Sequence, residues 1–310
     1  MPVLSIRHLT RYRYRNPVAL GEHRMMFRPR ESYDQRILSC ELTITPHPAR
    51  LRSIQDVFGN CVSVAEFSGA SRDLVFESRV TLEHTPLPAF ADVDGNVEVY
   101  TGAMPFAYSD ADLPDLELSM VRAHSDPEGR IDQWARQFVG AGETSLQTLL
   151  SEMTQAIRTT FKYRVRHAKG AQTPLETLTL GTGSCRDYAV FMIDAVRSLG
   201  LAARFVSGYI YTPYRPGAPI RQGGGHTHAW VRVYLPICGW VEFDPTNGIV
   251  GNSDLVRVAI ARDPRQALPL HGTWSGAPSD YLGMEVTVDV RSENSRSVQH
   301  SAAPAVRSDR

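Results

Sequence analysis

The chain has 310 residues, of which 42% are hydrophobic and 21% are charged. This is an ordinary globular composition, and it excludes a wholly disordered, collagen-like or coiled-coil chain; at about 150 residues per domain, the length allows two domains. The 33 basic residues equal the 33 acidic ones in number, so no overall positive charge favours nucleic acid or an anionic membrane as a partner.

Residues 1–88 have the pattern of an all-β domain. From Leu4 to Tyr14, every second residue is apolar, aromatic or β-branched, and this period of two is typical of a strand. Three further runs of this kind cover residues 37–45, 61–67 and 74–84. Residues 56–60 predict a hairpin turn. Short strands at this spacing favour a β-sandwich-like domain.

The rest of the chain predicts an α+β core, in which helices pack on an antiparallel sheet. Residues 89–128 contain several prolines and form a connecting region, and the core covers residues 129–291. Helical periodicity predicts helices over 131–138, 146–157, 173–181 and 184–199. Strands are predicted over 201–211, 228–235, 240–244 and 284–290. The tail at 292–310 has no periodicity and is predicted to be disordered.

Capping signals fix the start of two of these helices. Thr173 and Glu176 have the spacing of a capping box, with a proline at the first helical position. Ser184 and Asp187 have the same spacing, which places Cys185 just inside the longest helix.

Cys185 is the first candidate for chemistry. A helix N-terminus presents free backbone N–H groups and the positive end of the helix dipole, and both favour a thiolate. Glycines before Cys185 allow a substrate to approach the sulfur. The alternative is that a small residue merely packs at the start of the helix.

His228 and Asp244 are the second and third candidates. His228 begins a predicted strand after a glycine-rich loop, on the face opposite Ala229 and Val231. Asp244 ends the next strand and is positioned to accept a hydrogen bond from an imidazole. A four-residue hairpin connection would leave the two residues about 10 Å out of register, so the pair requires a bulge or a strong twist. The alternatives are a structural histidine and an aspartate that caps a turn.

Three motifs together resemble those of transglutaminase-like proteins. They are Cys185-Arg186-Asp187, His228-Ala229-Trp230, and Trp240 through Asp244-Pro245-Thr246. The resemblance is strongest over residues 145–250, and residues 1–88 are similar to the N-terminal domain of bacterial members. It implies a papain-like core with a catalytic triad of Cys185, His228 and Asp244.

The resemblance implies acyl transfer on amide bonds through a thioester. Attack by water would give a peptidase or amidase, and attack by an amine would give a transglutaminase; we favour hydrolysis of a peptide or isopeptide bond. The expected partner is a peptide or protein substrate, with neither nucleic acid nor membrane. The alternative is a non-catalytic peptide-binding module in which the triad is a relic.

No cofactor or metal is predicted. His226 precedes His228 by two residues and could join Cys185 and Asp244 in a zinc site, but neither Cys-x-x-Cys nor His-Glu-x-x-His is present. The four cysteines are too few for a disulfide scaffold, and the N-terminus does not have the pattern of a signal peptide. We therefore expect a cytoplasmic protein.

Overall fold

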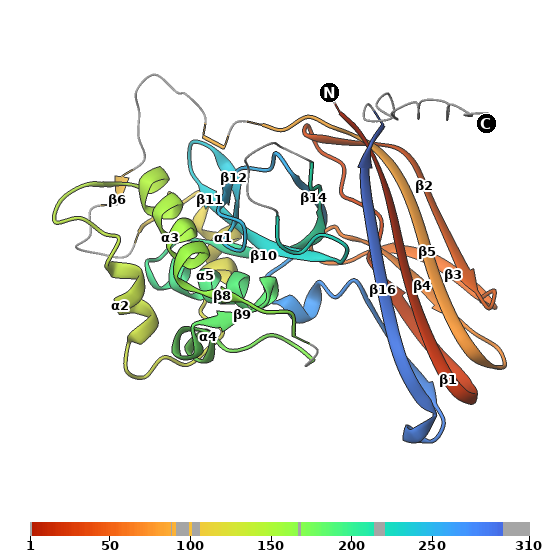
Figure 1. The fold of residues 1–310 in the computed structure, drawn as a ribbon. Helices are drawn as coiled ribbons and strands as arrows, with labels where there is room; N and C mark the ends of the chain where they lie inside the picture. The colour runs from red at the N-terminus through yellow and green to blue at the C-terminus, as the bar shows by residue number, and fades with distance from the viewer. Residues whose placement is uncertain are drawn as a thin grey trace, which may run out of the picture.

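The computed structural model describes residues 2–87, 89–90, 99–100, 106–166, 169–213 and 221–293. A long-stranded sheet stands beside a second unit in which helices and a smaller sheet pack together (Figure 1). The tail predicted to be disordered lies outside the described residues from residue 294 onward.

The N-terminal unit is one antiparallel sheet of seven strands. Its order is β2-β5-β1-β4-β3, and two strands from the end of the chain also pair with β1. The strands are β1 (Val3–Met25), β2 (Gln35–Thr45), β3 (Arg50–Gln55), β4 (Cys61–Glu66), β5 (Ala70–His84), β15 (Leu270–Ser275) and β16 (Tyr281–Ser292). The all-β prediction and the hairpin turn before Cys61 are therefore confirmed, whereas β3 was not predicted.

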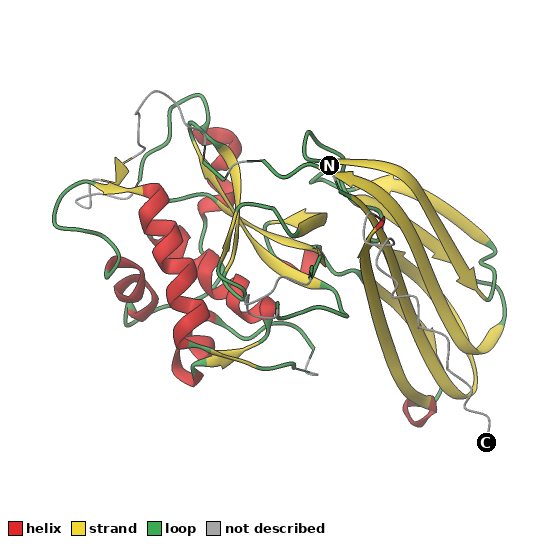
Figure 2. Ribbon diagram, turned by 45° about the horizontal axis from the view of Figure 1, so that its top comes forward, coloured by secondary structure: helices red, strands yellow, loops and turns green. Residues whose placement is uncertain are grey.

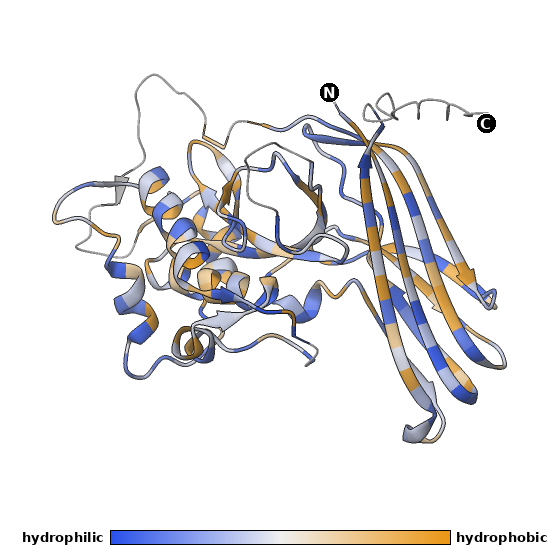
Figure 3. Ribbon diagram, viewed as in Figure 1, coloured by the Kyte–Doolittle hydropathy of each residue, from blue (hydrophilic) through white to orange (hydrophobic). Residues whose placement is uncertain are grey.

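The long strand β1 organises this sheet. Leu4, Ile6, His8 and Thr10 are buried, as the period of two predicts, and the same alternation of polar and apolar residues is visible along the long strands in Figure 3. The register of β1 shifts after Arg13: its first half pairs with β16, and its second half pairs with β15 and β4. Leu4 and Ile6 of the first half join the large core cluster, whereas Val18 of the second half belongs to a separate apolar cluster. The predicted sandwich-like domain is thus a single hydrogen-bonded sheet.

The sequence analysis placed residues up to 291 in the core, and the strand pairing corrects this assignment. β16 pairs with β1 from Leu4↔Ser292 to Tyr14↔Tyr281, so it belongs to the N-terminal sheet. Its alternating pattern correctly predicted a strand, but alternation does not specify which sheet the strand joins.

Among the described residues, the core contains a five-stranded sheet and five helices. The sheet order is β13-β12-β11-β10-β14. Its strands are β10 (Ala203–Ile210), β11 (His228–Leu235), β12 (Gly239–Asp244), β13 (Ile249–Val250) and β14 (Leu255–Ala261). The helices are α1 (Leu113–Met120), α2 (Arg130–Arg136), α3 (Leu146–Thr160), α4 (Pro174–Leu180) and α5 (Cys185–Ser198). The α+β prediction is confirmed, and α1 and β14 are additions to it.

Short elements complete the chain. Two paired strand fragments are β6 (Val99–Tyr100) with β7 (Thr144–Ser145), and β8 (Lys162–Tyr163) with β9 (Thr182–Gly183). The 3-10 turns are η1 (Pro264–Gln266) and η2 (Pro278–Asp280). The β8–β9 pair matters for the site, because β9 ends two residues before Cys185.

Helix α5 is the centre of the core. Almost all of its residues are buried, and it packs against α2, α4, β10 and β11. Figure 2 shows most helices on the side of the core sheet that faces away from the N-terminal sheet. A helix enclosed in this way holds its first residue in a fixed position.

A buried polar cluster joins the N-terminal sheet to the core. Arg257 of β14 donates to Asp34 at 2.6 Å and to Glu242 at 2.8 Å, and all three side chains are at most 5% exposed. Nearby, the side chain of Asn60 exchanges two hydrogen bonds with the backbone of Ile260. The N-terminal sheet is therefore fastened to an edge strand of the core sheet.

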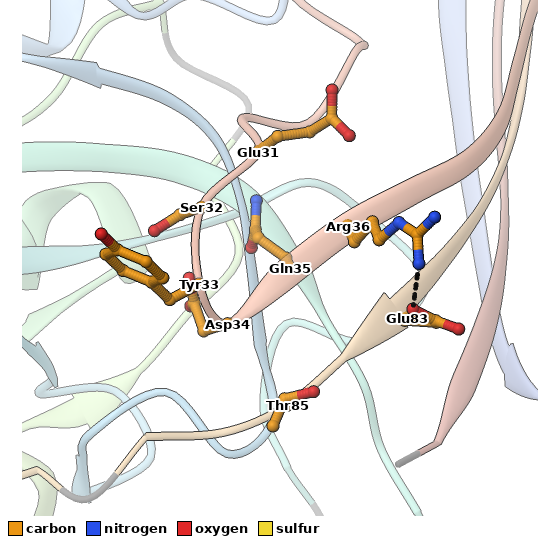
Figure 4. Close-up of a pocket in the computed structure, with 8 residues that line it drawn as sticks. All are labelled: Glu31, Ser32, Tyr33, Asp34, Gln35, Arg36, Glu83 and Thr85. Carbon is orange, nitrogen blue, oxygen red and sulfur yellow. Dashed lines mark ion pairs between the residues drawn. The ribbon is translucent and has the colours of Figure 1, made fainter.

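A hollow of about 500 Å³ lies beside this junction, with walls from residues 31–36, Glu83 and Thr85 (Figure 4). Arg36 and Glu83 form an ion pair at 3.6 Å, and Tyr33 is almost fully exposed. The lining of this hollow contains neither a cysteine nor a histidine.

Candidate active site

Cys185 is the first residue of α5, and its side chain is buried apart from one accessible edge. The predicted capping box at Ser184 and Asp187 is confirmed, because Oδ2 of Asp187 accepts from the backbone N of Ser184 at 2.7 Å and from its hydroxyl at 2.8 Å. The other oxygen, Oδ1, accepts from Arg166 and from the backbone N of Gln172, each at 2.7 Å. Asp187 therefore holds the turn that presents Cys185.

The structure brings His228 and Asp244 together without a bulge. Strands β11 and β12 pair Tyr234 with Trp240 and Val231 with Phe243. The hairpin connection is therefore one residue shorter than the four-residue connection that the sequence predicted. Asp244 then lies opposite Trp230, and His228 is its diagonal neighbour on the same face, which is within side-chain reach. Nε2 of His228 lies 2.8 Å from Oδ2 of Asp244, and both side chains are completely buried.

Asp244 also caps the turn that follows it, which was the alternative interpretation of this residue. Its Oδ1 accepts from the backbone N of Thr246 at 2.9 Å, and its Oδ2 accepts from the side chain of Asn247 at 2.8 Å. Both interpretations therefore hold, because the turn orients the carboxylate toward His228. Sequence reasoning missed the contribution of Asn247.

The buried pair favours a charged imidazole. Burial alone would lower the pKa of His228, but Asp244 and, to a smaller extent, Cys185 outweigh it and raise this pKa to about 10. Burial alone would raise the pKa of Asp244, but His228, Asn247 and Thr246 together lower it. Since Nε2 is occupied by Asp244, Nδ1 is the nitrogen left for the thiol of Cys185.

Cys185 and His228 line one cavity of about 390 Å³. One wall comes from the core, including Tyr163 of β8, Arg186 of α5 and Ser207 of β10. Another wall comes from the N-terminal sheet, and it includes His8 and Thr10 of β1, Leu270 of β15, and Met284 and Val286 of β16. The N-terminal sheet thus forms part of the candidate active site, a role that sequence reasoning missed.

Hydrogen bonds hold this second wall against the core. Nδ1 of His8 lies 2.9 Å from the Tyr209 hydroxyl, and its Nε2 lies 3.1 Å from the hydroxyl of Thr10. Burial lowers the pKa of His8 to about 4, so its ring is neutral at pH 7. On the other strand, the backbone N of Val288 donates to the carbonyl of Gly225 at 2.9 Å, in the loop that leads to His228.

The remaining sequence candidates lie around this site. Neither tryptophan of the motifs lines the cavity: Trp230 is fully buried with its ring stacked on His228 at 6.0 Å, and Trp240 lies beneath Arg204. His226 is exposed at the rim of the cavity. Within the described ranges, no three His, Cys, Asp or Glu side chains are arranged to hold a metal ion.

Comparison with known proteins identifies related sequences for both parts of the chain. Residues 4–83 match the bacterial transglutaminase-like N-terminal region, and residues 132–245 match the transglutaminase-like superfamily. An uncharacterised protein of Mycobacterium tuberculosis is 29% identical over 293 residues, which cover 92% of this chain and 91% of that protein. A second, from Mycobacterium leprae, is 24% identical over 303 residues, which cover 92% and 98% of the two chains.

A solved structure shares the whole fold. It is a proposed cysteine protease from Cytophaga hutchinsonii, with a TM-score of 0.66 and 18% identity, and the match covers 99% of this chain and 94% of that one. In the part of the chain that the structure describes, no helix is long and apolar enough to cross a membrane. The family matches support an enzyme that works through a cysteine.

Proposed function

Because the chain belongs to the transglutaminase-like superfamily, we propose that it transfers acyl groups from amide bonds through a thioester on Cys185. One observation carries this proposal: Cys185 and His228 line a single cavity, and the buried Asp244 lies 2.8 Å from His228. The acyl donor is a peptide or a protein, and the chemistry needs no cofactor.

In the first half of the reaction, the thiolate of Cys185 attacks the amide carbon and forms a C–S bond. The protonated His228 then gives its proton to the departing nitrogen as the C–N bond breaks, and an amine leaves. Asp244 stabilises the imidazolium before this transfer. The backbone N–H of Cys185, at the first position of α5, is a donor for the oxyanion.

In the second half, water attacks the thioester and His228 accepts its proton. The C–S bond breaks, the carboxylic acid leaves and the thiolate returns. An amine in place of water would give a new amide. We propose hydrolysis of a peptide or isopeptide bond as the main reaction, because the cavity is closed on one side by the N-terminal sheet and admits water more readily than a second polypeptide. The cytoplasmic location stays a prediction.

A peptide mixture containing glutamine and lysine, supplied with and without a primary amine, tests the proposal. Mass spectrometry would identify cleaved, deamidated and amine-labelled peptides. We expect cleaved or deamidated products from the wild-type protein, none from Cys185→Ala, and wild-type turnover from Cys238→Ala, whose cysteine lies outside the cavity. Equal turnover by Cys185→Ala and the wild type would refute the proposal.

The same variant separates the enzyme from the binding module. A vestigial triad predicts that Cys185→Ala preserves the cellular function of the protein. An enzyme predicts the loss of that function at unchanged protein abundance.

A further inference from the structure

Two arginines, Arg166 and Arg186, line the cavity, and its lining contains no aspartate or glutamate. Arg166 is already paired with Asp187 at 2.7 Å. An excess of positive charge therefore surrounds the sulfur of Cys185.

Arg186 is the arginine of this cavity that has no anionic partner among the described residues. It directly follows Cys185 in α5, and its side chain is half-buried. Within the described ranges it makes no ion pair or hydrogen bond, whereas most other arginines near the core are paired with a carboxylate or a carbonyl. Arg186 is also close enough to affect the pKa of Tyr163 in the cavity wall. Burial, Cys185 and Asp244 raise this pKa, and the positive charge of Arg186 lowers it.

Partial burial of a guanidinium that has no partner carries a desolvation penalty. The hydrogen bonds and charge of a bound anion would offset this penalty. The guanidinium group has the planar geometry that binds a carboxylate through two hydrogen bonds. From the placement of Arg186 beside Cys185, we infer that the acyl group accepted by this site carries a carboxylate, which Arg186 binds. This inference rests on the proposed function and narrows its substrate to an acidic peptide.

Two alkylating reagents with the same leaving group test the inference. Iodoacetate carries a carboxylate, iodoacetamide is its neutral counterpart, and peptide mass spectrometry measures the rate of each at Cys185. We expect the ratio of the iodoacetate rate to the iodoacetamide rate to fall by about tenfold in Arg186→Gln, because one nearby positive charge is lost. A general change in thiol reactivity alters both rates equally and leaves their ratio unchanged. Arg186→Lys is expected to restore most of the wild-type ratio.

Two references accompany this measurement. Arg72→Gln removes an exposed arginine of β5 that is outside the cavity, so its ratio at Cys185 should equal that of the wild type. In every variant, the alkylation rates at Cys238 measure the reactivity of the two reagents away from the cavity. An unchanged ratio in Arg186→Gln would overturn the inference.

The two proposals fail in different ways. If the triad is not functional, His228→Ala will leave the reaction of Cys185 with both reagents unchanged. If only the anion site is wrong, His228→Ala will slow both reagents while Arg186→Gln leaves the ratio intact. The glutamyl α- and γ-nitroanilides, compared with the glutaminyl α-nitroanilide, then distinguish a side-chain carboxylate from a main-chain one.

Discussion

At the scale of single residues, the charge of His228 depends on Asp244. The imidazole is completely buried, and burial disfavours its protonated form, yet the carboxylate 2.8 Å away raises the pKa to about 10. In the proposed mechanism, His228 therefore holds the proton for the leaving amine throughout the neutral range. This proton is lost only as the pH rises through the raised pKa.

Replacement of Asp244 by Asn should lower the pKa of His228. The substitution removes the charge that favours the imidazolium and leaves burial, which opposes it, so His228 should lose its proton at a lower pH, by at least about one unit. NMR of ring-labelled histidine would follow the titration of His228 in both proteins. Titration of His228 at the same pH in both proteins would contradict the role given to Asp244.

At the scale of elements, the geometry of the site depends on the lengths of the loops that connect its strands. His228 and Asp244 could be identified from the sequence as the ends of two adjacent strands, but their contact could not. A hairpin connection shorter by one residue moves Asp244 from opposite Val231 to opposite Trp230. Residue types do not fix connection length to that accuracy, whereas the capping box at Ser184 could be predicted because it depends only on local spacing.

The glycine-rich loop before β11 is a second connection that affects the position of His228. Gly223 has φ +88°, and a Cβ there would lie 2.5 Å from Nδ1 of His228. Gly225 has φ +83°, but a Cβ there would meet nothing within 4 Å. The two glycines share the left-handed backbone and differ in what they touch.

Alanine at these two positions separates backbone strain from displacement of the histidine. Both variants should lose about 1–2 kcal/mol of unfolding free energy, because alanine is strained at positive φ. Only Gly223→Ala should also slow the alkylation of Cys185, since its methyl group must push His228 aside. Urea unfolding and alkylation kinetics provide the two readouts. Equal slowing in Gly225→Ala would show that the loop acts through its backbone alone.

At the scale of the whole molecule, the two units depend on one another. β16 returns from the core to β1, and Arg257 joins Asp34 of the N-terminal unit to Glu242 of the core. The sequence pattern predicted β16 as part of the core, because pairing between residues nearly 290 positions apart, such as Leu4 and Ser292, leaves no local signal. The wall at His8 and Met284 was missed for the same reason.

Replacement of Arg257 by Met should destabilise both units together. It leaves Asp34 buried without its cation and Glu242 with Arg232 alone, at 3.6 Å, and an uncompensated buried charge costs about 3–5 kcal/mol. Arg36→Met removes an exposed ion pair with Glu83 and should cost at most about 1 kcal/mol. Urea unfolding, followed by tryptophan fluorescence and by circular dichroism, should give a single coincident transition for the wild type. Two separated transitions would contradict the coupling of the units.

The return of β16 also has a consequence for biosynthesis. A ribosome makes Cys185, His228 and Asp244 before it makes Met284 and Val286, which complete the cavity wall. The bond from Val288 to the glycine loop is likewise formed by the last strand. A nascent chain therefore carries Cys185 in an open, unfinished site, and the enclosed cavity exists only after the last strand has left the ribosomal tunnel and joined the first.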